Sequence, residues 1–85
     1  AMDMPGMATR AEVAELSTLP LADAEIAFLR LLIRHHRGGV EMAEAVVQLT
    51  DRPEVLRAAK AVQTSQTNEI DVMNAMLATR GEAPE

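Results

Sequence analysis

The fold of this chain is decided by residues 28–45, which read F-L-R-L-L-I-R-H-H-R-G-G-V-E-M-A-E-A. When this segment is wound as a helix at about 100° per residue, its arginines and glutamates fall on one narrow stripe. Nearly everything else is apolar, so we expect a long helix over residues 21–50 with that stripe in solvent. One partner helix cannot cover so wide an apolar surface, and packing on at least two sides is predicted.

Two more helices are predicted on either side of this one. The string T-R-A-E, beginning at Thr9, is a capping box and starts a short helix over residues 9–19. The string D-R-P-E-V starts a helix over residues 53–80, with Asp51 as its cap and Pro53 in its first turn. Gly81 is expected to end that helix. Residues 1–8 form a methionine-rich arm without periodicity.

The predicted fold class is all-α, as a single helical domain over residues 1–85. The last helix has a four-three spacing typical of shallow helix packing, at Val55, Ala59, Val62, Gln66, Glu69, Met73 and Met76. An antiparallel hairpin that turns near Arg52 would put His35 level with Glu69. A domain of this size buries only about 60–65% of its unfolded surface, so we expect a second copy to complete a four-helix bundle by dimerisation.

Composition excludes several classes of function. Thirteen acidic and eight basic residues give a net charge of −5, which disfavours nucleic-acid and anionic membrane surfaces. No cysteine is present, so neither a disulfide nor a thiolate metal site can form. No segment is long and apolar enough to span a bilayer, and no signal peptide is visible. Without a phosphate loop, a nucleophile elbow or a Glu-x-x-His pair, an enzymatic role is poorly supported.

The two adjacent histidines are the candidates for chemistry. They diverge by about 100° on a helix, so we expect His35 to face the hairpin partner and His36 to face the first helix or another subunit. Met42 follows His35 by two helical turns on the same stripe, and imidazole with thioether suits copper. Met4 and Met7 of the arm could wrap Cu(I) in the same way.

A plainer interpretation stays open beside the copper hypothesis. Both histidines could be buried neutral imidazoles held by Glu69, by Gln66 or by a backbone carbonyl, with Met73 filling core volume. The glycines at positions 38 and 39 could make room for a ligand, permit close helix approach or merely kink the helix. The second hypothesis is therefore a structural or interaction domain that dimerises through its wide apolar face.

Four strings in this order resemble the bacterial domain-of-unknown-function family three-hundred-and-five: D-M-P-G-M, residues 28–43, D-R-P-E-V and Q-T-N-E-I-D-V-M. The resemblance covers residues 3 to about 77 and implies a ferritin-like helical fold. It also implies an exported or envelope-associated location and, for some members, copper binding. Carried over by position, it implies that metal-associated residues here are His35, His36, Met42, Met4 and Met7, faced by Gln66, Glu69 and Met73.

The same resemblance sets two expectations about how this chain departs from the family. Relatives commonly hold two histidine-bearing hairpins in one chain, whereas this sequence has one, so a homodimer would supply the second. Alanine is the more usual residue where Gly39 stands.

Overall fold

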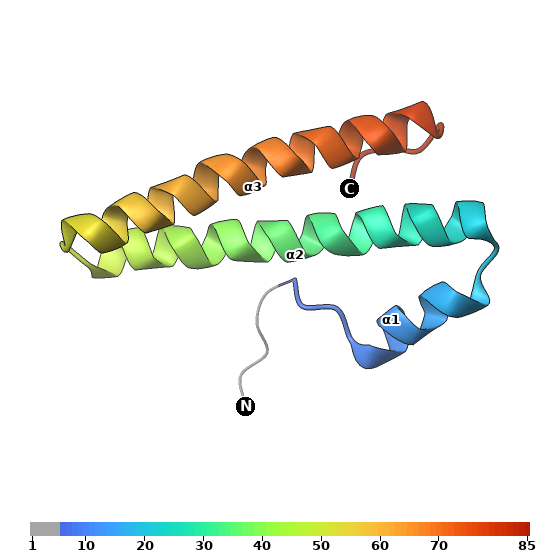
Figure 1. Ribbon diagram of the computed structural model, residues 1–85, viewed down its shortest axis with the longest axis horizontal. Helices are drawn as coiled ribbons and strands as arrows, with labels where there is room; N and C mark the ends of the chain where they lie inside the picture. The colour runs from blue at the N-terminus through green and yellow to red at the C-terminus, as the bar shows by residue number, and fades with distance from the viewer. Residues whose placement is uncertain (1–5) are drawn as a thin grey trace.

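The helices begin and end where local hydrogen-bonding chemistry allows. The computed structural model describes residues 6–85: α1 spans Arg10–Glu15 and continues into the 3-10 turn η1, Leu16–Thr18, while α2 spans Leu21–Leu49 and α3 spans Pro53–Thr79 (Figure 1). No strand occurs in this part of the chain, and the all-α prediction is confirmed.

Two of the three predicted helix-end signals are confirmed. The Thr9 hydroxyl accepts from the Glu12 amide at 3.1 Å and the Glu12 carboxylate accepts from the Thr9 amide at 2.9 Å, which completes the capping box. Gly81 ends α3 with φ of 75°, a backbone conformation that favours glycine. The predicted Asp51 cap is wrong, because Arg52 stands at the cap position and no side chain there bonds to the helix.

The core lies between α2 and α3, which run antiparallel beside each other (Figure 1). Leu29 and Ile33 of α2 pack with Met73 and Leu77 of α3, and Ile33 and Leu77 are fully buried. Burying an aliphatic side chain of this size is worth about 1.5–3 kcal/mol, so this cluster holds the hairpin together.

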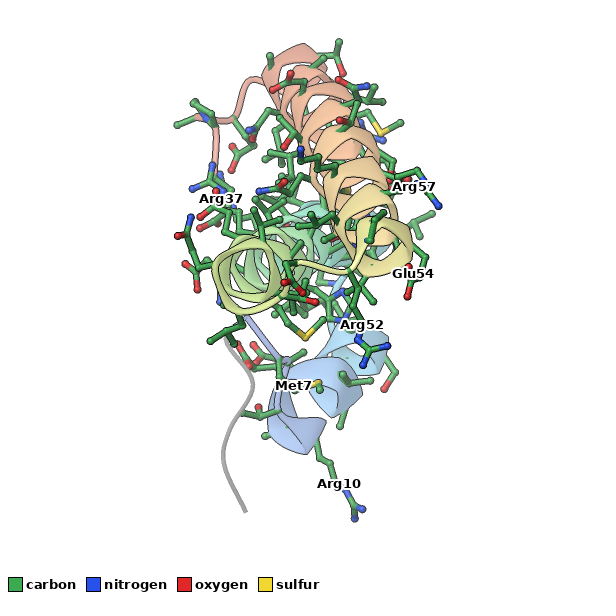
Figure 2. The ribbon with its side chains drawn as sticks, turned by 90° about the vertical axis from the view of Figure 1, so that its left-hand side faces the viewer. Met7, Arg10, Arg37, Arg52, Glu54 and Arg57 are labelled. Atoms are coloured by element: carbon green, nitrogen blue, oxygen red, sulfur yellow. The ribbon has the colours of Figure 1, made fainter. Side chains whose placement is uncertain are left out.

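The three helical segments form one layer. Figure 2 looks along the long axis and shows α3, α2 and the short N-terminal segment stacked one above another. The molecule measures 47 × 32 × 16 Å, and its shortest extent leaves room for little more than one helix diameter of about 10–12 Å. The two broad faces of the layer therefore have no helix over them among residues 6–85.

One broad face is charged. Arg30 contacts the carboxylates of Glu82 and Glu85 at 3.3 Å, and Arg37 donates to the main-chain oxygen of Glu85. The Glu85 amide donates to the side chain of Asn74 at 2.9 Å, so the chain after α3 lies across the arginine side of α2. This solvated side is the stripe that the sequence predicts.

Candidate functional site

The N-terminal arm reaches α2 through Gly6. A Cβ atom at this position would stand 2.0 Å from the carbonyl oxygen of Arg34 and 3.3 Å from the Cα of His35, and φ here is 78°. Only glycine combines that conformation with so close an approach to another main chain. The next residue, Met7, is therefore held beside the middle of α2, and Figure 2 shows it between α2 and α1.

Met7 and His35 line the same groove. It holds about 390 Å3 between α2 and the N-terminal segment, and its wall consists of Met7, Ala8, Val13, Leu16, Phe28, Leu31, Leu32 and His35. His35 supplies the only nitrogen or oxygen side chain in that wall and is exposed. No hydrogen bond joins its ring to any other residue of the described chain, so both ring nitrogens are available to a ligand.

Both ring nitrogens of His36 have hydrogen-bond partners within the hairpin. Its Nδ1–H donates to the Leu32 carbonyl oxygen at 2.8 Å, and its Nε2 lies in hydrogen-bonding contact with the Glu69 carboxylate of α3. The His36 side chain is 13% exposed, against 58% for Glu69, so the contact crosses from the hairpin interior to its edge. This ring ties α2 to α3, as the plainer interpretation of the histidines expects.

The predicted directions of the two histidines are therefore wrong. His35, and not His36, faces the N-terminal segment, while His36 meets Glu69. The reason is that α2 has two apolar stripes: Ile33 is fully buried against α3, and His36 follows it by three residues on the same side. The sequence does not distinguish which stripe α3 covers.

The other candidate ligands are dispersed. Met42 is 51% exposed and lies nearer the hairpin turn, in a groove with Ala43, Val46, Val55, Ala58, Ala59 and Val62. Met73 is buried among Leu29, Ile33 and Leu77, which makes it a core residue. The candidate ligand Met4 lies outside the described residues. Of the predicted set, the structure brings together His35 with Met7 and His36 with Glu69.

Two polar features accompany these pairs. The Gln66 side-chain oxygen is buried without a hydrogen-bond partner, beside Gly39, where a Cβ atom would stand 2.4 Å from it. The sequence places Gln66 correctly on the side of α3 that faces α2. The contact between Gly6 and the main chain of α2 is not predicted from the sequence. The only sequence signal for it is the Pro5-Gly6 pair, which is equally typical of an ordinary loop.

Electrostatics hold the wall of the groove in place. Hydrogen bonds from the Thr9 main chain, and then from its hydroxyl, lower the pKa of the Glu12 carboxyl, and the Arg34 guanidinium lowers it further against the opposing effect of desolvation. Arg34 contacts Glu12 at 3.5 Å, so the start of α1 is linked to α2 one residue before His35.

Within residues 6–85, no three His, Asp or Glu side chains gather closely enough to hold a metal ion. No helix there is both long and apolar enough to cross a membrane.

Comparison with solved structures gives close matches. A DUF305 protein from Streptomyces coelicolor, provisionally named a secreted protein, is 43% identical with a TM-score of 0.86, and the match covers 96% of this chain and 51% of that one. A DUF305 fragment from Deinococcus radiodurans is 49% identical with a TM-score of 0.82, covering 89% of this chain and 49% of that one. This chain thus spans about half the length of these relatives.

Comparison with curated proteins gave no match. The model of the family described as "Domain of unknown function (DUF305)" matches residues 1–77, which include the arm, α1, α2 and nearly all of α3. This chain belongs to the DUF305 family.

Proposed function

We propose that this protein binds copper as Cu(I), with the His35 imidazole and the Met7 thioether as its central ligands. The observation that carries the proposal is the close contact between Gly6 and the main chain of α2 at Arg34. This contact holds Met7 in the same groove as His35, whose imidazole has no hydrogen-bond partner among the described residues. Thioether sulfur and imidazole nitrogen favour Cu(I) over hard cations such as magnesium and calcium. Met4 is a further thioether of the same arm, three positions before Met7, whereas Met42 of α2 lies in a separate groove and is not part of this site.

The surroundings of this pair support a soft, weakly hydrated ion. Apart from His35, the groove wall is made of alanine, valine, leucine, phenylalanine and methionine side chains. It holds no carboxylate that would favour a hard divalent cation. In this proposal, His36 and Glu69 bind no copper and serve to fix α2 on α3. The protein would act as a copper-handling module outside the cytoplasm, in line with the relative named as secreted.

Competition with a chromophoric Cu(I) chelator under anaerobic conditions tests the proposal. We expect His35→Ala and Met7→Leu each to weaken Cu(I) binding by about tenfold or more, because each removes one ligand. Met76→Leu is the matched control, since Met76 is 43% exposed on α3 and takes no part in the groove. Unchanged affinity in both His35→Ala and Met7→Leu would refute the site.

A second candidate function is supported by a different observation. Leu21, Phe28 and Leu49 of α2 are 79%, 50% and 85% exposed, which is more apolar surface than one small helix usually leaves in water. A structural or interaction domain that dimerises through α2 would bury them. A protein that assembles through this surface while neither His35→Ala nor Met7→Leu alters any metal binding would favour this alternative.

A further inference from the structure

α2 has a second stripe whose side chains stay exposed in the hairpin. Every seventh residue from position 21 to position 49 belongs to it, and we call these five residues the outer stripe: Leu21, Phe28, His35, Met42 and Leu49. A helix returns to nearly the same direction after seven residues, with a drift of about 20° per heptad, so the stripe turns by about 80° around α2 over its four heptads. All five side chains are exposed, in contrast to the buried Leu29, Ile33 and Ala43 on the side toward α3.

The outer stripe borders both grooves of α2: Phe28 and His35 line the groove beside the N-terminal segment, and Met42 lines the groove shared with α3. The arginines that hold the chain after α3 lie on another side of α2, so the stripe is free of charged residues. The groove of Met7 and His35 opens beside its middle, and the groove of Met42 beside its C-terminal half. Small domains bury their apolar faces between at least two layers, and this layer is 16 Å across its shortest axis.

The size of the relatives indicates what covers this face. Each matching solved chain is about twice as long as this one, so it contains roughly another hairpin's length of protein. A second copy of the 85 residues is about as long as that additional part. A face of 47 by 32 Å is ample for the roughly 800 Å2 that each partner buries in a stable complex.

We propose that two copies pack their outer stripes against each other about a two-fold axis, with both His35 side chains at that axis. A two-fold interface pairs each contact with its reciprocal. His35 is the middle member of the stripe, with two apolar residues on either side, so complete overlap pairs it with His35 of the second copy whether the helices run parallel or antiparallel. The only polar residue of the stripe then lies at the centre of the interface.

This arrangement deepens the proposed function and rests on it for the identity of the ion. Two imidazoles at the axis, each with its own Met7, would offer two nitrogen and two sulfur donors to one ion. The copper site would then be shared, with one Cu(I) per two chains. A cation between the rings also offsets the cost of burying two unpaired imidazoles.

Sedimentation velocity of the full chain tests the interface. We expect a dimer at micromolar concentration, with the dissociation constant raised about 100-fold or more by Phe28→Asp, because an uncompensated carboxylate would be buried. Leu21→Asp should act in the same direction while keeping the fold, since Leu21 is 79% exposed and an acidic residue is favourable in the first turn of a helix. Gln48→Asp, on the exposed polar side of α2, is the control and should leave the dimer intact. A parent protein that sediments as a monomer would overturn the proposal.

The stoichiometry of Cu(I) binding tests the shared site separately. The parent should bind one Cu(I) per two chains, and Leu21→Asp, which lies outside the groove wall, should lose affinity together with assembly. One Cu(I) per chain, bound equally well by the parent and by monomeric Leu21→Asp, would overturn the shared site and leave the proposed function standing. A dimer that binds no Cu(I) would overturn both the shared site and the proposed function, and would leave the interface itself supported.

Discussion

Gly6 controls the position of the arm because it has no side chain. In Gly6→Ala the new Cβ would overlap the Arg34 carbonyl at 2.0 Å, and φ of 78° is unfavourable for alanine by about 1–2 kcal/mol. We expect the arm to leave α2 and the Cu(I) affinity to fall to that of Met7→Leu, while helix content measured by circular dichroism stays the same. Gly81→Ala is the control: it strains a glycine with φ of 75° in open space and should not change Cu(I) binding. Full affinity in Gly6→Ala would mean that the arm contributes no ligand.

The histidines show what could be predicted of single residues from the sequence. The sequence correctly predicted that the two rings point to different surroundings, because adjacent helical residues diverge by about 100°. It could not predict which surroundings belong to which ring, since both stripes of α2 are apolar and either could face α3. Which ring faces α3 is determined by contacts between residues that are far apart in sequence, such as His36 and Glu69, which are separated by 33 positions.

At the scale of elements, the glycine at position 39 lowers the helix propensity of α2 and leaves room for the Gln66 amide. Gly39→Ala should stabilise the protein by up to about 1 kcal/mol, the difference in helix propensity between the two residues. The new Cβ would stand 2.4 Å from the Gln66 side-chain oxygen, but that atom is the end of a flexible side chain and has no hydrogen-bond partner to lose. Urea denaturation measures the change. A loss of stability would show that the buried position of the Gln66 amide is required.

The stability of the capping box at the start of α1 should decrease at low pH. The pKa of Glu12 is lowered below its ordinary value of 4.5, so its contribution to the capping box is fully present above that value and is lost as the pH falls through the lower pKa of the folded state. We expect the protection factors of the Thr9 and Glu12 amides, which correct for the pH dependence of intrinsic exchange, to fall over that range before the hairpin unfolds. Thr9→Ala, which lacks the hydroxyl partner, should exchange faster already at neutral pH and respond less to acid. Equal pH responses in both proteins would contradict this account.

Helix ends were predictable to the extent that local chemistry sets them. The Thr9–Glu12 box and the position of Gly81 depend on residues within a few positions of each other, and both form as predicted. The cap of α3 depends on how the turn between α2 and α3 is spanned: the Arg52 amide donates to the Thr50 hydroxyl at 3.2 Å, and Asp51 is left outside the cap. The geometry of a turn between packed helices is not contained in the motif alone.

At the scale of the whole molecule, stability depends on very few side chains. Leu77 is fully buried between the helices, so Leu77→Ala should cost about 2–5 kcal/mol, a large part of the roughly 5–15 kcal/mol that stabilises a small protein. Met76→Ala, next in sequence but 43% exposed, should cost about 1 kcal/mol or less. Thermal denaturation of the two variants at equal protein concentration compares them. Similar melting temperatures would contradict the assignment of the core.

The sequence predicted the architecture of the molecule better than the arrangement of its site. Apolar periodicity and helix-end signals were enough for an antiparallel hairpin preceded by a short helix. They could not show that the arm turns back onto the main chain at Arg34, or that Met42 and Met73 lie apart from His35, because these placements depend on the whole layer.

The different surroundings of Gly6 and Glu85 have a practical consequence for experiments. Gly6 lies against α2 next to His35, so a polyhistidine tag joined before the arm would bring foreign imidazoles to the same groove and could supply a copper ligand of its own. Glu85 lies on the arginine side of α2, away from the outer stripe. A fluorophore or surface tether is therefore better attached there, where it leaves both the groove and the apolar face open to measurement.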